Sequence, residues 1–257
     1  MAPATLEATR LDAPGSTLVL YRTTRNAPVL TNLAAAGVGG GALHAHGPAL
    51  HGNDGVEAAE TVTMLAQQRG VTAMIWDGDA PTDLAGVYRL AKEAEASLVV
   101  VEWQPAVRGG DALAREVLAD PPCDVLLVRP GEIADIREIV VAVGPGPNAP
   151  LLAHLARSWA AAFGVTATTL HRVASDDEVA AGRALCKRLA PELKAVVEVG
   201  RDLTNLLAEC AARTGFIALG ATEHVALDRV AARTASGQLA TRAGATVVVG
   251  RRPASPA

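Results

Sequence analysis

The sequence predicts an α/β fold made of two tandem domains, each with a five-stranded parallel sheet, and three observations support it. The chain of 257 residues is 50% hydrophobic but only 3% aromatic, which is typical of a globular protein with an aliphatic core. The segment 26–34 recurs at 148–156 with six of nine residues identical. Short β-branched runs alternate with helical patterns in both halves, as in β-α-β units. We therefore expect two similar α/β units.

The repeat keeps an offset close to 122 residues, and local shifts of this offset mark insertions between fixed elements. Apolar runs bounded by turn residues predict the strands of the first copy at 17–21, 41–46, 72–77, 97–102 and 124–129. The strands of the second copy are expected at 138–143, 165–171, 195–199, 215–220 and 245–250. The resulting organisation is an N-terminal arm (1–16), a first domain (17–130), a second domain (131–252) and a tail (253–257).

Helices are expected between these strands, and the clearest one begins near Asn148. This residue type caps helices, and Pro150 suits the first turn. Leucines and Trp159 then fall on one face of the helix, which is expected to cover the sheet.

Charge and cysteine usage exclude several classes of protein. The net charge of -4 and the lack of a basic block disfavour nucleic-acid binding. No uninterrupted apolar run has the length of a membrane span, and the start of the chain has no export signal, so we expect a cytoplasmic protein without direct membrane insertion. Cys123, Cys186 and Cys210 form no Cys-x-x-Cys pair and are expected to be buried, reduced thiols.

Four segments resemble the universal stress protein family. They are 137–143 and 245–249 in the second copy, and 98–103 and 121–129 in the first. The resemblance implies Rossmann-like domains of the adenine-nucleotide alpha hydrolase type, packed as a pseudo-dimer. It also implies that the two final strands, near 124–129 and 245–250, are the contact edges.

Nucleotide-binding members of that family carry G-x2-G-x9-G-[ST] after the fourth strand, where glycines and a hydroxyl approach the phosphates. The second copy keeps the first glycine as Gly220 and the hydroxyl as Thr234, but has Glu223 and Arg233 at the other glycine positions. The counterpart in the first copy begins at Glu102 and has neither the leading glycine nor the hydroxyl.

The family also implies an aspartate at the end of the first strand, where this chain has Arg22 in the first copy and Gly144 in the second. The candidate nucleotide loop is therefore made of Gly144, Gly146, Gly220, Arg233 and Thr234, with ATP or AMP as the ligand.

Two further patterns have alternative interpretations. Residues 144–149 match G-x-G-x-x-A of dinucleotide-binding loops, but the second strand ends without the acidic residue that would hold a ribose, so a tight turn is favoured over NAD binding. His44, His46 and His51 have a spacing that metal sites use, although ordinary histidines at a strand end are favoured and no metal is expected. No nucleophile motif is present, so we assign no catalytic residue.

Three functions are compatible with these features. The first is a non-enzymatic stress-response regulator that acts through an unknown protein partner, with nucleotide binding lost or residual and at most weak ATP hydrolysis. The second is a sensor of ATP or AMP that uses the second domain. The third is a soluble adapter of a membrane transporter, since related tandem domains occur attached to transporters. Edge strands left over by the two domains also favour a homodimer.

Overall fold

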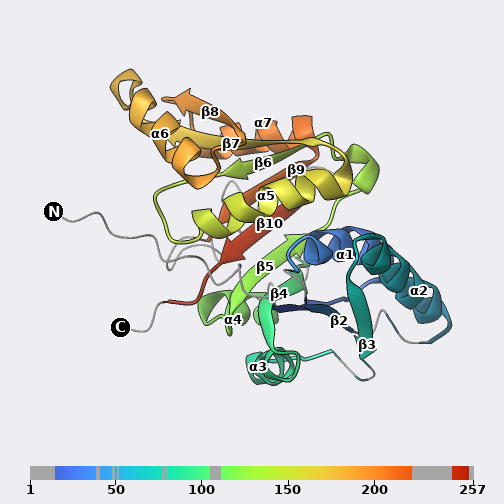
Figure 1. Cartoon of the computed structure of the whole chain (residues 1–257). Coiled ribbons are helices and arrows are strands. Elements are labelled where there is room, and N and C mark those ends of the chain that lie inside the picture. Colours follow the sequence, from blue (N-terminus) through green and yellow to red (C-terminus); the bar gives the residue numbers. More distant parts are fainter. Residues whose placement is uncertain are drawn as a thin grey trace.

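The ten strands form one continuous sheet in the order β3-β2-β1-β4-β5-β10-β9-β6-β7-β8 (Figure 1). The computed structural model describes residues 15–38, 41–47, 50, 52–76, 78, 80–104, 111–221 and 245–254. All strand pairs are parallel except β5 with β10, which are antiparallel. The strands of the first half therefore run opposite to those of the second.

The first half of the chain supplies five strands and four α-helices. These are β1 (Ser16–Leu20), α1 (Ala27–Ala35), β2 (Ala42–His46), α2 (Gly52–Gln68), β3 (Thr72–Trp76), α3 (Leu84–Glu93), β4 (Ala96–Glu102), α4 (Ala112–Ala119) and β5 (Asp124–Arg129). A short 3-10 helix, η2 (Thr24–Asn26), precedes α1, and η4 (Ile133–Asp135) links the halves.

The second half repeats this order as far as the structure describes it. Its elements are β6 (Glu138–Ala142), α5 (Ala149–Phe163), β7 (Thr166–Val173), η5 (Asp176–Glu178), α6 (Val179–Leu189), β8 (Lys194–Val199), α7 (Leu203–Thr214), β9 (Phe216–Gly220) and β10 (Thr246–Arg251). Every predicted strand is present, with bounds shifted by at most two residues.

The sheet corrects one part of the predicted fold, because the structure has a single ten-stranded sheet in place of two separate five-stranded sheets. Each half still contributes five adjacent strands, in the same order from the outside inwards. The two final strands were predicted as the contact edges, and this is confirmed: β5 and β10 pair from Arg129↔Val247 to Val125↔Arg251.

Apolar side chains on both faces of the sheet are covered by helices. One face packs against α1, α2, α5 and α6 in a core that runs through both halves. The other face packs against α3 and α4 in the first half and α7 in the second. The alternation of neighbouring residues such as Val140 and Val141 between these cores is what a strand buried on both faces requires.

The first-named face also joins the halves directly. The indole of Trp159 on α5 is fully buried, and its Nε1 donates a hydrogen bond to the Leu33 carbonyl oxygen of α1 over 3.0 Å.

None of the helices in the described ranges is long and apolar enough to cross a membrane. The three cysteines are free thiols, with Cys186 and Cys210 buried and Cys123 half-buried.

Candidate functional site

Each half has a topological switch point at the carboxyl ends of its parallel strands. In the first half β1 lies between β2 and β4, and in the second half β6 lies between β7 and β9. The connections that leave two adjacent strands at such a point, here β1 and β4 or β6 and β9, run to opposite sides. Ligands of open α/β sheets bind in the crevice formed there. The two candidate sites are therefore the β1/β4 crevice and the β6/β9 crevice.

The β6/β9 crevice contains three of the predicted site residues. Gly144 and Gly146 lie in the turn after β6, and Gly220 is the last residue of β9. A Cβ atom built on Gly220 would lie 3.0 Å from Cβ of Asn148, whereas one on Gly144 or Gly146 would meet nothing within 4 Å. The glycines thus share one crevice, and its turn is open. Arg233 and Thr234 lie outside the described residues, as does Glu223.

Asn148 joins this turn to the ends of two strands. Its Nδ2 donates to the Ala221 carbonyl oxygen after β9, and its Oδ1 accepts from the Arg252 backbone N–H after β10 at 2.8 Å. The predicted helix start at Asn148 is confirmed, but its side chain makes no capping bond to α5. The side chain bonds the two strand ends instead, so it ties the start of α5 to the ends of β9 and β10.

The β1/β4 crevice has a carboxylate where the other crevice has a glycine. Glu102 pairs with Val128 across β4 and β5, and Gly220 pairs with Gly250 across β9 and β10. Both partners are 122 residues apart, so the register of the sheet places Glu102 and Gly220 at equivalent positions.

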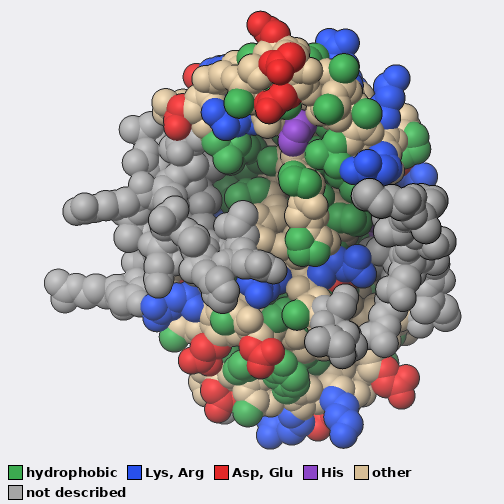
Figure 2. Space-filling view, turned by 90° about the vertical axis from the view of Figure 1, so that its left-hand side faces the viewer, with side chains coloured by type: hydrophobic (Ala, Val, Ile, Leu, Met, Phe, Trp, Pro, Cys, Tyr) green, Lys and Arg blue, Asp and Glu red, His purple; other side chains and the backbone are tan. Residues whose placement is uncertain are grey.

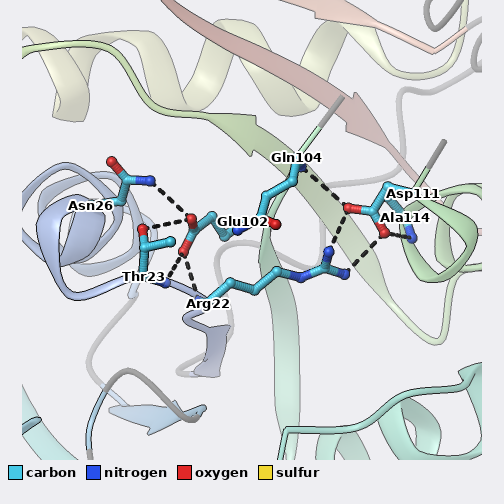
Figure 3. Close-up of polar contacts among 7 residues, drawn as sticks. All are labelled: Arg22, Thr23, Asn26, Glu102, Gln104, Asp111 and Ala114. Carbon is cyan, nitrogen blue, oxygen red and sulfur yellow. Dashed lines mark hydrogen bonds and ion pairs between the residues drawn. The ribbon is translucent and has the colours of Figure 1, made fainter. Parts of the chain in front are cut away.

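Four donors converge on the fully buried Glu102 side chain (Figure 3). Its Oε2 accepts from the backbone N–H groups of Arg22 at 2.7 Å and Thr23 at 3.0 Å. Its Oε1 accepts from Thr23 Oγ1 and Asn26 Nδ2, both at 2.8 Å. The carboxylate therefore accepts hydrogen bonds from the backbone N–H groups at the turn after β1, as a bound anion would.

A second carboxylate, Asp111, lies next to this network (Figure 3). Arg22 donates two hydrogen bonds to it, at 2.8 and 2.9 Å, in a fork geometry. The backbone N–H groups of Gln104 and Ala114 also donate to Asp111, at 3.2 and 3.1 Å, the latter because Asp111 is the N-cap of α4. The Asp111 side chain is only 2% exposed, so it ties α4 to the ends of β1 and β4.

Together the two carboxylates accept the donors that a phosphate would need in this crevice. A phosphate entering it would meet two negative charges and would have to displace one of them from four donors. The β1/β4 crevice is therefore filled by the chain itself, whereas the corresponding position at the β6/β9 crevice has no side chain.

The histidines of β2 lie apart from both crevices. His44 and His46 pack edge-on against Trp76, with ring centroids 5.1 and 6.4 Å from it. Both are buried, and burial lowers the pKa of His44. Over the ranges that the structure describes, no three metal-ligating side chains come together, and His51 lies outside them.

Comparison with known proteins gives a match in structure alone. No protein-family model matches the sequence, and no curated protein resembles it in sequence. Among solved structures, the cytoplasmic domain of a prokaryotic cation chloride cotransporter aligns with a TM-score of 0.65 at 13% identity, covering 93% of this chain and 95% of that one.

Two universal stress proteins align over a similar length. The protein from Archaeoglobus fulgidus gives a TM-score of 0.60 at 15% identity, covering 92% of this chain and 96% of its own. A putative universal stress protein from Pseudomonas aeruginosa gives 0.57 at 18% identity, covering 94% of both chains. The chain has the universal stress protein fold. Within this fold, Glu102 stands where the resemblance places the first glycine of the nucleotide loop.

Sequence reasoning missed the roles of Glu102, Asp111 and Arg22. It identified Glu102 only as a missing glycine and Arg22 as a missing aspartate. A signal was nevertheless present, because Glu102 directly ends the apolar run from Leu98 to Val101. A charged residue that continues a buried strand is expected to have an internal partner.

Proposed function

We propose that this protein is a non-enzymatic regulator of the universal stress type, that it acts through contacts with other proteins, and that its first half has lost nucleotide binding. The observation that carries the proposal is the buried Glu102 carboxylate, which takes four donors at the crevice where a phosphate would bind. The Arg22–Asp111 pair supports it, because the Arg22 guanidinium, which lies beside the Glu102 network, is already held by a carboxylate.

The same proposal divides the chain into universal-stress domains at 17–130 and 131–252, which pack as a pseudo-dimer. The equal strand order of the two halves supports this division. The antiparallel β5–β10 pair supports it as well, since two copies of one domain related by a two-fold axis meet through the same strand in opposite directions.

An ATP hydrolysis assay on the whole chain tests the non-enzymatic part. We expect no phosphate release above that of a buffer control. Turnover that a Thr234→Ala change abolished would refute the proposal, because it would show a working phosphate loop in the second half. Glu116→Ala, at an exposed position on α4, is the matched control variant.

A sensor of ATP or AMP in the second half is a second candidate, favoured by the open turn at Gly144 and Gly146. The lack of a side chain at Gly220 also favours it. On the side of the molecule where both termini lie, acidic side chains gather towards the top and bottom, whereas Lys and Arg are found at the top, at the bottom and also in the middle (Figure 2). An anion that approached the middle of this side would meet positive charge.

Titration of ATP and AMP into the protein tests the sensor. It requires about one site per chain, and Gly220→Glu should abolish binding by placing in the second half the carboxylate of the first. Gln68→Glu adds the same charge at an exposed position of α2 and should leave binding unchanged. Silence with both nucleotides at millimolar concentration would exclude the sensor.

A soluble adapter of a membrane transporter is a third candidate. The similarity to the cytoplasmic domain of a cation chloride cotransporter, over 93% of this chain, favours it. Affinity capture from detergent-solubilised membranes is the test. The adapter role requires a transporter among the captured proteins, and a capture without any membrane protein would refute it.

A further inference from the structure

The two ends of the sheet have equivalent positions, but the helices beside them carry opposite charge. β3 and β8 are the terminal strands, and each has one strand neighbour among the described residues. α2 packs beside β3 and α6 beside β8, both on the same face of the sheet (Figure 1). An edge strand offers unpaired backbone groups to a further strand, so each end is able to extend the sheet.

The first of these surfaces, the α2–β3 end, is apolar and acidic. β3 (Thr72–Trp76) has no charged residue, and its Met74 is 47% exposed. Val56 and Met64 on α2 are 59% and 50% exposed and line a groove of about 450 Å³ together with Glu60. The sequence of α2 contains no Lys or Arg, and Glu57 and Glu60 are exposed. Within β3 itself there is no lysine or proline of the kind that commonly prevents strand pairing at an edge.

On the second surface, the α6–β8 end, the helix α6 is basic. Arg183, Lys187 and Arg188 are all exposed on α6, and this helix contains no acidic residue. β8 (Lys194–Val199) is half-buried and apolar in its middle, with Lys194 at its start and Glu198 near its end. Acidic residues lie before the helix, in η5 (Asp176–Glu178), and not within α6 itself. Long basic side chains also carry aliphatic stems, which can cover apolar surface such as that of Val56 and Met64.

We propose that the α2–β3 end of one chain binds the α6–β8 end of a second copy of the chain, head to tail. First-half and second-half strands run in opposite directions, so a second copy placed next to the first sets β3 antiparallel to β8. The shared helical face then brings the acidic α2 beside the basic α6. The same contact recurs at the free ends, so the assembly grows by one chain at a time.

The pleat of the two strands allows a favourable register for this contact. Met74 and Val196 lie on the face of the sheet that carries α3 and α7, since their neighbours in the sheet belong to those cores. With Met74 opposite Val196, Trp76 comes opposite Lys194 on the same face. Ile75 comes opposite Ala195 on the other face, where both pack against the core beneath α2 and α6. Each pair joins side chains that favour one another across strands.

A closed two-fold dimer through either end is disfavoured by like charges. Pairing β3 with its own copy would bring Glu57 and Glu60 of two α2 helices together, and pairing β8 with its own copy would do the same for Lys187 and Arg188. Repulsion between such charges acts against these partners. The charges of the helices beside the edge strands thus favour pairing of β3 with β8 over pairing of either strand with its own copy. The proposal is independent of the regulatory function proposed above.

Sedimentation velocity of the full-length protein over a wide concentration range, at about 50 mM and at about 500 mM salt, tests this contact. The wild-type chain is expected to form dimers and larger species with rising concentration, more strongly at low salt. Reversal of the basic helix by Lys187→Glu with Arg188→Glu should raise the dissociation constant about tenfold or more. Reversal of the acidic helix by Glu57→Lys with Glu60→Lys should have the same effect.

Rescue makes the test specific. A chain with all four reversals, or an equimolar mixture of the two double variants, should associate like the wild type, because opposite charges again face each other. Arg89→Glu with Lys92→Glu, two exposed residues on α3, changes the net charge equally to the α6 reversal and should leave association unchanged. A wild-type monomer at all concentrations, a closed dimer unaffected by the reversals, or failure of the rescue would each overturn the proposal.

Discussion

Glu102→Ala is the change that most directly perturbs the filled crevice of the first half. It removes the acceptor of four hydrogen bonds of 2.7 to 3.0 Å, two of them from backbone N–H groups of the turn after β1. Each donor left buried without an acceptor costs about 1–3 kcal/mol, and the change leaves four neutral donors without their carboxylate. We expect these donors together to lower the free energy of unfolding by about 3–5 kcal/mol.

Glu102→Gln is expected to lose less, about 1–2 kcal/mol. Its amide oxygen can still accept from the backbone N–H groups of Arg22 and Thr23. Its NH₂ group can donate to the Thr23 hydroxyl, and Asn26 can turn its own amide to accept. The loss then reflects mainly the exchange of charge-assisted hydrogen bonds for neutral ones.

Urea unfolding followed by tryptophan fluorescence measures these losses, because Trp159 and Trp103 are 0% and 2% exposed. Glu116→Ala on the exposed face of α4 is the control and should stay within about 0.5 kcal/mol of the wild type. The reasoning is refuted if Glu102→Ala unfolds at the same urea concentration as this control. It is also refuted if Glu102→Gln is the more damaging of the two changes at Glu102.

Three further predictions concern other parts of the structure. Gly215→Ala should destabilise the protein by at least about 2 kcal/mol more than Gly164→Ala. Both glycines have left-handed backbones. A Cβ atom on Gly215 would lie 1.9 Å from the Asp135 carbonyl oxygen, whereas one on Gly164 would meet nothing within 4 Å. Because burial lowers the pKa of His44, protonation favours the unfolded state, so stability should fall as the pH drops below about 6.5. In urea unfolding, the midpoint concentration of His44→Gln should depend less on pH in this range than that of the wild type. An unchanged pH dependence would contradict the prediction. Burial raises the pKa of the Cys123 thiol to about 12 and those of the other two cysteines as well, so Ellman's reagent at pH 8 should label none of the three until the protein is unfolded, and rapid native labelling would contradict it.

The sequence predicted the strands well because most of them are buried on both faces. Such a strand is a nearly continuous apolar run, so 124–129 was predicted and Asp124–Arg129 is found. The longer β7, which ends at Val173 rather than 171, shows the usual error at an element's end. The resemblance predicted which strands form the contact edges, but the sequence itself did not predict that these edges pair and join the two sheets into one. That pairing joins strands more than 100 residues apart and leaves no local pattern.

The candidate nucleotide loop stays a prediction. Gly144 and Gly146 follow β6 and Gly220 ends β9, and these two strands are neighbours in the sheet, so the internal repeat did indicate which loops lie at one crevice. The role of Glu102 depends on donors from residues 76 to 80 positions earlier, and a motif that records only glycines has no place for it. Alignment of the two copies revealed that Glu102 stands where the second half has Gly220. Only the hydrogen bonds in the structure show that this carboxylate fills the crevice.

Isothermal titration of ATP and AMP into the wild-type protein tests the central claim most directly, since the account rests on a crevice that the chain fills with its own carboxylates. The account predicts no micromolar binding of either nucleotide. Micromolar binding at about one site per chain that Gly220→Glu abolished would contradict the regulator without nucleotide and establish the sensor in the second half. Micromolar binding that persisted in Gly220→Glu and was lost in Arg22→Ala would contradict the filled crevice of the first half.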